Sequence, residues 1–400
     1  MFWEILLAIV IGVTSGIITG LIPGIHINLV SVLLVTSSPF LLQWFSPLAL
    51  GCFIIAMSVV HTFLDTIPSV FLGAPEADTA LGVLPGHRYL MRGNGFMAVK
   101  LTLLGSFAGL FLSVTLFPVF LFIVEKAYNI ISGHIGWLLL LVVIGMILRE
   151  SKKGWAVYIF FISGALGYLL LNFEIIEQPL FPLLSGLFGV STLLISLRGK
   201  TGIPPQKIMD TTEIRPWLIG KASLSGQFSG FLTAMLPGLG AATAAVIGMQ
   251  LTRKLGDYGF MVLLGSISTV NFVLSLATYL VIGKARNGSI VAVKELLGSA
   301  EPSLIMMFLA VAIVAGFLSL ILGLGLSRFV ARHISSLNYP RLVLLVVLFI
   351  GVLTLLLSGP IGLLVLLTST CIGIIPAIVK TARIHGMGCL LLPVMLYFLL

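Results

Sequence analysis

Apolar residues occur along this chain in long runs, which short polar or basic stretches separate. Several runs approach the ~20 residues that an α-helix needs to cross the hydrocarbon core of a bilayer. The pattern therefore predicts an all-α polytopic membrane protein. We expect full membrane spans near residues 47–66, 96–124, 134–149, 155–172, 179–197, 260–283, 303–327, 342–357, 361–379 and 387–400.

Two segments that lie half a chain apart are similar to each other and differ from these plain runs. Residues 12–32 read GVTSGIITGLIPGIHINLVSV, and residues 226–246 read GQFSGFLTAMLPGLGAATAAV. Each segment is a hydrophobic helix that Pro-Gly interrupts. Aligned without a gap, the two segments match at Gly12 and Gly226, Ser15 and Ser229, Gly16 and Gly230, Thr19 and Thr233, Pro23 and Pro237, and Gly24 and Gly238.

The two Pro-Gly segments predict two re-entrant helical hairpins, at residues 4–36 and 222–252. Each half of the chain then has one hairpin and about five transmembrane helices. Because five is odd, the second half is inverted in the membrane relative to the first, as in transporters built from inverted repeats. We expect a first repeat at 1–197, a cytoplasmic connector at 198–221 and a second repeat at 222–400.

The composition and the positions of the charges agree with a multi-pass protein of the cell membrane. Hydrophobic residues make up 59% of the chain and charged residues 9%, whereas a soluble domain has roughly a quarter charged residues. The net charge of +9 comes from short basic clusters between apolar runs, which mark cytoplasmic loops rather than a nucleic-acid surface. In this scheme Lys284, Arg286 and Lys294 fall on the outer side, against the usual bias.

The Pro-Gly breaks are the first candidate binding site. A helix break in a membrane persists only where it is buried in protein or lines a water-filled cavity. The amides at the start of the following half-helix carry the positive end of a helix dipole, which suits an anion. Two breaks that meet at the midplane would form one anion site. The alternative is a plain proline kink, with Gly12, Gly16 and Gly20 as a stripe for close helix packing. The candidate substrate-binding residues are Pro23, Gly24, His26, Asn28, Pro237, Gly238, Gly240, Thr243 and Arg88.

The ionisable residues of the first half supply candidates for coupling to an ion gradient. His61 and Asp65 lie four residues apart on one face of a predicted span, and Asn271 falls near the repeat position of His61. Charge inside a membrane is a functional hypothesis by default, although Asp65 could instead cap the end of the span. The first half also has extra residues around 73–87, which bring Glu76 and Asp78 as candidates or as solvated loop carboxylates.

Three islands of the sequence follow one another in an order that resembles a known family. They are LIPG near the N-terminus, GAPEADTALGVLPGHRYLMRGNGFMAVKLTLLGSFAG from Gly73, and MLPGLG at mid-chain. In this order they resemble the large permease subunit of the tripartite tricarboxylate transporters, the TctA family. This chain is shorter than is typical of the family and departs from its pattern at His26, Asn28 and the stretch from His61 to Asp65.

The resemblance implies a secondary transporter of carboxylates, driven by a proton or sodium gradient. It also implies an extracytoplasmic solute-binding protein and a small membrane subunit as partners. A homo-oligomer is a further expectation. We expect no cofactor besides the coupling proton or sodium ion, and no metal site, because Cys52, Cys371 and Cys389 lie in apolar stretches without ligand spacing.

Two other classes of protein remain as alternatives. A translocase of a polyprenyl-phosphate lipid would use the same breaks for its phosphate group, together with Arg88 or Arg286. A lateral opening toward lipid would distinguish it from a carrier of soluble anions. An intramembrane enzyme is disfavoured, because the chain has neither an HExxH nor a GxSxG motif. ATP as the energy source is disfavoured too, because no GxxxxGK[ST] motif is present.

Overall fold

The fold is helical throughout the part of the chain that the structure describes. The computed structural model describes all residues except 1, 24–29, 31–33, 36, 75–79, 173–175, 177, 198–201, 209–214, 236–240, 253–254, 286 and 299. Within these limits it contains helices and no strand. Seven of its helices are long and apolar enough to cross a membrane. The prediction of an all-α polytopic membrane protein is therefore confirmed.

The first half of the chain forms helices of very different lengths. In chain order these are α1 (Phe2–Leu21), α3 (Ser38–Leu41), α4 (Pro47–Leu64), α5 (Thr66–Phe71), the 3₁₀-helix η1 (Ala80–Gly82), α6 (Val83–Met91), α7 (Gly95–Thr115), α8 (Phe117–Ser132), α9 (Ile135–Leu148), α10 (Lys153–Asn172), α11 (Leu180–Leu184), the π-helix η2 (Ser185–Val190) and α12 (Ser191–Ser196).

The second half has fewer and longer helices. They are α13 (Pro216–Met235), α14 (Ala241–Leu251), α15 (Gly256–Ile282), α16 (Gly288–Leu297), α17 (Pro302–Ile334), α18 (Tyr339–Val379), the 3₁₀-helix η3 (Arg383–Met387) and α19 (Gly388–Leu399).

Most predicted spans coincide with these helices, but one is divided between two helices and two lie within one kinked helix. The predicted span at 96–124 is wrong as one helix, because α7 ends at Thr115 and α8 begins at Phe117. The predicted spans at 342–357 and 361–379 are joined in α18, which is broken at Gly359 by a positive φ of 66°. Pro360 follows, and its ring prevents a regular helical turn at this point. The break therefore lies where the sequence predicts the end of a span.

The first residues of several long helices fix where the helix begins: proline lies in the first turn, and two of the helices also have a side-chain cap. Proline occupies the first turn of α4, α17 and α18, where its missing amide proton has no helical partner to lose. Before α4, the side chain of Ser46 accepts a hydrogen bond from the amide of Ala49 at 3.2 Å. Before α18, Asn338 accepts one from the amide of Arg341 at 3.2 Å. These caps satisfy amides that the helix leaves open.

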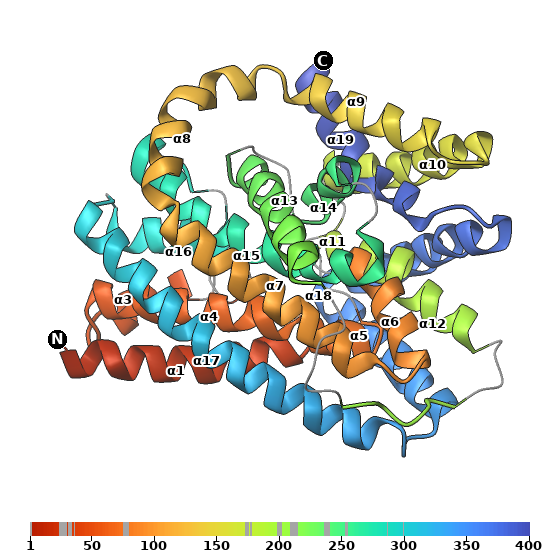
Figure 1. The fold of residues 1–400 in the computed structure, drawn as a ribbon, viewed down its shortest axis with the longest axis horizontal. Helices are drawn as coiled ribbons and strands as arrows, with labels where there is room; N and C mark the ends of the chain where they lie inside the picture. Colours follow the sequence, from red (N-terminus) through yellow and green to blue (C-terminus); the bar gives the residue numbers. More distant parts are fainter. Residues whose placement is uncertain are drawn as a thin grey trace.

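The helices pack as two groups. The central group contains α1, α4–α8 and α13–α17, and the side group contains α9–α12 with η2, and α18 and α19 with η3. In Figure 1, α1, α4 and α17 of the central group lie at the opposite end of the molecule from α9, α10 and α19 of the side group. Each half of the chain thus contributes its first helices to one group and its last helices to the other.

Glycines bring the helices within each group to backbone contact. In the central group, a Cβ added at Gly105 would lie 2.0 Å from the carbonyl oxygen of Val262, and one at Gly265 would lie 2.0 Å from that of Thr102. In the side group, a Cβ at Gly167 would lie 1.9 Å from the carbonyl oxygen of Cys389. Lipid tails give no hydrophobic drive for helix association, so close packing of small residues holds such bundles together.

The two Pro-Gly segments enter this packing in the same way. A Cβ at Gly16 of α1 would meet the Cβ of Val60 on α4 at 2.6 Å, and one at Gly230 of α13 would meet that of Val270 on α15 at 2.8 Å. The hydroxyls of Thr19 and Thr233 also donate to equivalent carbonyls, those of Gly16 and Gly230. The matched sequences therefore lie in matched environments. Whether the two halves are inverted in the membrane, and whether the hairpins are re-entrant, stay predictions.

A substitution that adds one methyl group tests the contact of Gly230 on α13 with α15. We expect Gly230→Ala to destabilise the protein by about 1–3 kcal/mol, because overpacking forces neighbouring atoms apart. Gly351→Ala in α18 is the matched control, since a Cβ there would meet nothing within 4 Å. Thermal unfolding of the purified variants in detergent measures both. An equal melting temperature for Gly230→Ala and the native protein would contradict the packing.

Candidate functional site

A cavity of about 600 Å³ lies between the central group and the side group. The central group lines it with residues of η1 and α6, the C-terminal end of α14 and the first turns of α15. The side group lines it with Arg149 after α9, with Phe188 of η2 and with the segment 382–384 around the start of η3. Both groups therefore build its wall, so a relative movement of the groups would change its shape.

Three arginines from three different segments line the cavity. Arg88 lies on α6, with its Nη1 3.5 Å from a carboxylate oxygen of Asp257 at the start of α15. Arg149 donates a hydrogen bond to the side-chain oxygen of Gln250 near the end of α14. Arg383 donates one to the hydroxyl of Thr192 on α12. Among the charged residues that line the cavity in the described part of the chain, three are cations and one is an anion.

The arginines influence one another. Burial and the neighbouring charge of Arg88 lower the pKa of the Arg383 guanidinium to about 10. At neutral pH Arg383 therefore keeps its charge, although that charge is less favourable than in water. The Arg88 side chain is 48% exposed and Asp257 is 35% exposed, so water screens their ion pair. An anion that entered the cavity would relieve the unfavourable charge on Arg383.

The rest of the wall is apolar. It includes Leu81, Phe188, Met249, Phe260 and Ile384. Phe188 lies in η2, whose hydrogen bonds follow the rare π-helical pattern that often occurs at functional sites. An apolar wall with a few convergent charged groups is typical of small-molecule sites. Guanidinium groups bind carboxylates and phosphates with paired hydrogen bonds. The cavity is therefore suited to a small organic anion.

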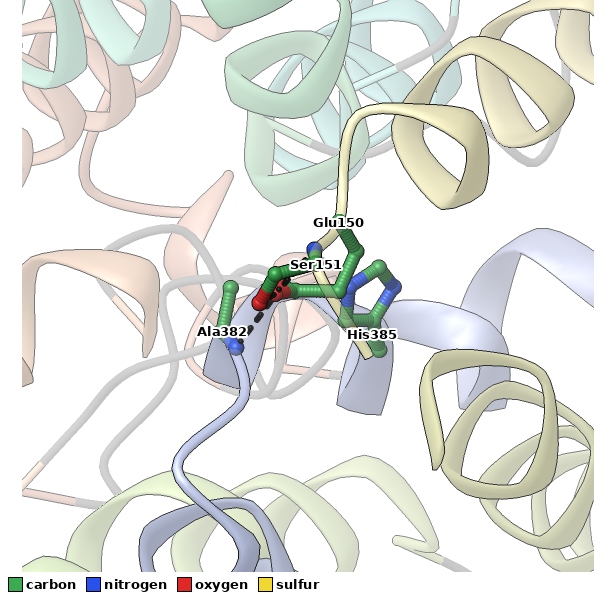
Figure 2. Close-up of polar contacts among 4 residues, drawn as sticks. All are labelled: Glu150, Ser151, Ala382 and His385. Carbon is green, nitrogen blue, oxygen red and sulfur yellow. Dashed lines mark hydrogen bonds and ion pairs between the residues drawn. The ribbon is translucent and has the colours of Figure 1, made fainter. Parts of the chain in front are cut away.

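The cavity lies where loops that the sequence assigns to the cytoplasmic side meet. The loop after α9 is joined to the end of α18, because Lys152 Nζ donates to the carbonyl oxygen of Val379 at 2.7 Å. Figure 2 shows a second connection, in which Glu150 accepts a hydrogen bond from the amide of Ala382 at 3.0 Å. Both loops carry predicted cytoplasmic cations, and the side of the membrane on which they lie stays a prediction.

The predicted substrate-binding residues are described only in part. Arg88 lines the cavity. Pro23 is buried at the end of α1. Thr243, in the first turn of α14, is 1% exposed, and its hydroxyl oxygen has no hydrogen-bond partner among the described residues. The other predicted substrate-binding residues lie outside the described residues: Gly24, His26, Asn28, Pro237, Gly238 and Gly240.

The cavity and the second Pro-Gly break lie at opposite ends of α14. Met249 of α14 lines the cavity, whereas the break at 236–240 precedes the first residue of this helix, Ala241. A helix of this length spans roughly 16 Å at 1.5 Å per residue. Thr243 does not line the cavity, and it lies six residues from Met249 on α14, roughly 9 Å at 1.5 Å per residue.

The predicted ion-coupling residues lie elsewhere in the central group. His61 is 3% exposed on α4, and its Nδ1 lies 3.2 Å from the hydroxyl of Thr19 on α1. Asp65, 2% exposed, is the residue at which α4 passes into α5. Asn271 follows Val270 as His61 follows Val60, and these valines contact Gly230 and Gly16; a role of His61 or Asn271 in ion coupling stays a prediction. Glu76 and Asp78 lie outside the described residues, just before Ala80 of the cavity wall.

Reasoning from the sequence missed two of the three cavity arginines. Arg149 and Arg383 look like ordinary cytoplasmic anchors, because each follows or precedes an apolar run. Only the packing of α9 and η3 beside α14 brings them to Arg88. Among the described residues, no group of three or more histidine, cysteine or acidic side chains is placed to hold a metal ion.

A buried histidine joins the two groups close to the cavity. His87 of α6 is 4% exposed, and its Nε2 lies 2.9 Å from the hydroxyl of Tyr339 at the start of α18. The same hydroxyl makes a hydrogen bond with Ser196 of α12. Burial and the charge of Arg383 lower the pKa of His87 to about 4. His87 is therefore neutral at physiological pH.

This pKa predicts a loss of stability in mild acid. Because the folded-state pKa of His87 lies below the unfolded value of 6.5, its contribution is complete above pH 6.5 and is lost as the pH falls toward 4. The loss approaches roughly 3 kcal/mol, at about 1.4 kcal/mol for each pKa unit. We expect His87→Gln to show a weaker fall in melting temperature between pH 7 and 5 than the native protein. His333→Gln, an exposed site on α17, is the control, and parallel pH profiles for all three proteins would contradict the assignment.

Comparison with known proteins places the chain in a family. The family model of the tripartite tricarboxylate transporter TctA family matches residues 6–388. An uncharacterized protein of Methanocaldococcus jannaschii is 29% identical over 357 residues, which are 88% of this chain and 87% of that protein. No solved structure matches the chain. Because the family match covers nearly the whole chain, with its apolar helices and its cavity, this protein belongs to the tripartite tricarboxylate transporter TctA family.

Proposed function

We propose that this chain is a permease subunit that carries a small organic anion, with a di- or tricarboxylate as the substrate class, across the cell membrane. Membership of the TctA family supports transport. The observation that carries the choice of an anion is the cavity, which is lined by Arg88, Arg149 and Arg383 and by one acidic side chain. A substrate with two or three carboxylates would neutralise these cations.

The position of the cavity supports transport by alternating access. Its arginines come from both helix groups, with Arg88 in the central group and Arg149 and Arg383 in the side group. An anion bound between them would attract both groups at once. Movement of the side group against the central group would then open the cavity to one side of the membrane and close it to the other.

In this proposal the Pro-Gly breaks form the deeper part of the path. The buried hydroxyl of Thr243, at the start of α14, is available to a substrate that reaches the break. The amide groups at the tips of the two hairpins would hold the anion at the midplane of the membrane. The arginine cavity, which opens to one side of the membrane and then to the other as the groups move, would be the part of the path next to this site.

The energy source in this proposal is a proton or sodium gradient. His61, Asp65 and Asn271, with Glu76 and Asp78, are the coupling residues that the sequence proposes. His61 and Asp65 are almost completely buried, which is the condition under which binding of an ion changes the local energy most strongly.

Two partner proteins complete the proposal. An extracytoplasmic solute-binding protein would deliver the anion, and a small membrane subunit would accompany the permease, as the word tripartite in the family description suggests. Membrane lipid surrounds the helices, and assembly of several copies of the chain stays a further proposal.

A lipid phosphate is the alternative substrate. A polyprenyl-phosphate carrier lipid has the same charge chemistry at its head group, so the arginines would bind it by the same contacts. The difference is the acyl tail, which would need a path from the cavity to the surrounding lipid. The two candidates therefore differ in the ligand that stabilises the purified protein.

Ligand-dependent thermal stability tests the substrate class. We expect citrate or another carboxylate to raise the melting temperature of the native protein, and Arg383→Gln to weaken this binding by about tenfold or more, since a hydrogen bond to a charged group contributes about 1.5–3 kcal/mol. Arg332→Gln, an exposed position near the end of α17, is the matched control. Stabilisation by a polyprenyl phosphate alone, with or without sodium, would overturn the choice of a soluble anion.

Replacement of Pro237-Gly238 by Ala-Leu tests the role of the break. A continuous helix would hide the amides that the break exposes, so we expect uptake into proteoliposomes to be abolished while membrane insertion and yield change little. Uptake at the native rate would reduce the break to a kink.

A further inference from the structure

Glu150 and His385 form a buried connection between the two loops that border the arginine cavity (Figure 2). One carboxylate oxygen of Glu150 accepts a hydrogen bond from the amide of Ala382 at 3.0 Å and lies 3.3 Å from Nε2 of His385. The other oxygen accepts one from the amide of Ser151 at 3.0 Å. The carboxylate is thus fixed in place, with the imidazole against it.

The other nitrogen of this imidazole is available. The side chain of His385 is 1% exposed, and that of Glu150 is 13% exposed. Nδ1 of His385 is buried and has no hydrogen-bond partner among the described residues. When Nε2–H donates to Glu150, Nδ1 is therefore an acceptor with nothing bound to it. A single proton fits this position, and its charge would be balanced by the carboxylate on the opposite side of the ring.

The other charged groups of the two loops are directed elsewhere. Arg149 donates to Gln250, Lys152 to the carbonyl oxygen of Val379, and Arg383 to Thr192. Lys153 and Lys380 are exposed. From α10, the group that faces His385 is the hydroxyl of Ser163, which is 3.4 Å from the carbonyl oxygen of His385. The cations at 253 and 254, after α14, lie outside the described residues.

Glu150 and His385 are each the next residue in the chain after a residue that lines the cavity. Glu150 follows Arg149, and His385 follows Ile384, while Arg149, Arg383 and Ile384 all line the cavity. In this proposal the negative charge of Glu150, the next residue after Arg149, partly offsets the positive charge at the cavity while His385 is neutral. When His385 is protonated, the pair is neutral as a whole and this offset disappears. The arginines then attract an anion more strongly.

We propose, on the basis of the proposed function, that Glu150 and His385 form the binding site of a proton that is transported together with the anion. The proton passes from water to Nδ1 of His385 and leaves an imidazolium that is paired with the Glu150 carboxylate. On the other side of the membrane the same proton returns to water, and the imidazole is neutral again. Binding of proton and anion is cooperative and reciprocal.

In this structure the environment of His385 favours its neutral form, from which the proton has been released. Burial lowers the pKa of His385, and its partner Glu150 only partly opposes this effect. Burial raises the pKa of Glu150, but hydrogen bonds from Ala382, His385 and Ser151 together bring it below the ordinary value. At a cytoplasmic pH near 7 the pair is therefore a neutral imidazole beside a carboxylate. Loss of the proton weakens the hold of the cavity on the anion, so both are released on the same side.

The first test needs no transported substrate. The histidine ring signals of the purified native protein are followed by NMR as the pH changes, and His385→Gln identifies the signal of this residue among the six histidines. We expect His385 to titrate below its ordinary value of 6.5, because burial lowers its pKa. A ring that does not titrate at any pH at which the protein stays folded would overturn the proposal.

The second test separates coupling from transport. In proteoliposomes, exchange of internal for external labelled citrate needs no net movement of protons, whereas accumulation driven by a pH gradient does. We expect His385→Gln and Glu150→Gln to keep exchange near the native rate and to lose pH-driven accumulation by about fivefold or more, the lower end of usual coupling strengths. Citrate binding should tighten as the pH falls in the native protein and lose this dependence in His385→Gln. Because both proteins are measured with citrate, the titration of citrate itself affects both in the same way.

Two further variants make the result specific. His333→Gln, which changes an exposed histidine of α17, should behave like the native protein. His61→Gln tests the competing coupling residue. Loss of pH-driven accumulation in His61→Gln, with native accumulation in His385→Gln, would overturn the proposal. Absence of exchange in the native protein with every carboxylate would instead count against the proposed function, and the NMR titration would still decide whether His385 binds a proton.

Discussion

The hydrocarbon core of a membrane cannot form hydrogen bonds, and this constraint governs every level of the structure. Backbone groups must find partners inside their own helix, and the hydroxyl side chains of the spans follow the same rule. Ser163 donates to the carbonyl oxygen of Ile159 at 2.7 Å, and Ser58 donates to that of Ile54 at 2.7 Å. Polar groups that have no such local partner gather where helices meet, so the seams between helices are the places where chemistry is available.

Close backbone packing decides where those seams lie. Glycines such as Gly105 and Gly265 hold the central group together, and Gly167 and Gly388 hold the side group together. The contact between the groups is looser and more polar, with hydrogen bonds such as that of His87 with Tyr339. A protein with two tight bodies and a polar seam can move one body against the other without breaking its internal packing. The arginine cavity occupies this seam.

The seam carries an excess of positive charge. Arg88, Arg149 and Arg383 come from separate segments, and the energy of holding them near one another is offset when an anion enters. Glu150 and His385 adjoin residues of the same wall in the chain, and in our proposal the charge of this pair adjusts the attraction of the cavity for an anion. In the proposed function, substrate and proton would be linked through simple electrostatics over a few residues, without a long pathway through the fold.

The sequence by itself determined the membrane class, most helix positions and the equivalence of the two Pro-Gly segments. Apolar run length, basic loops and the repeated Gly and Pro positions are local signals that need no knowledge of the fold. The sequence also places Asn271 near the repeat position of His61, and this correspondence stays a prediction. Only the tertiary structure brought Arg149 and Arg383 to Arg88, and Glu150 to His385. Such meetings depend on how distant helices pack, and a charged residue at the end of a span looks the same in the sequence whether it anchors a loop or lines a cavity.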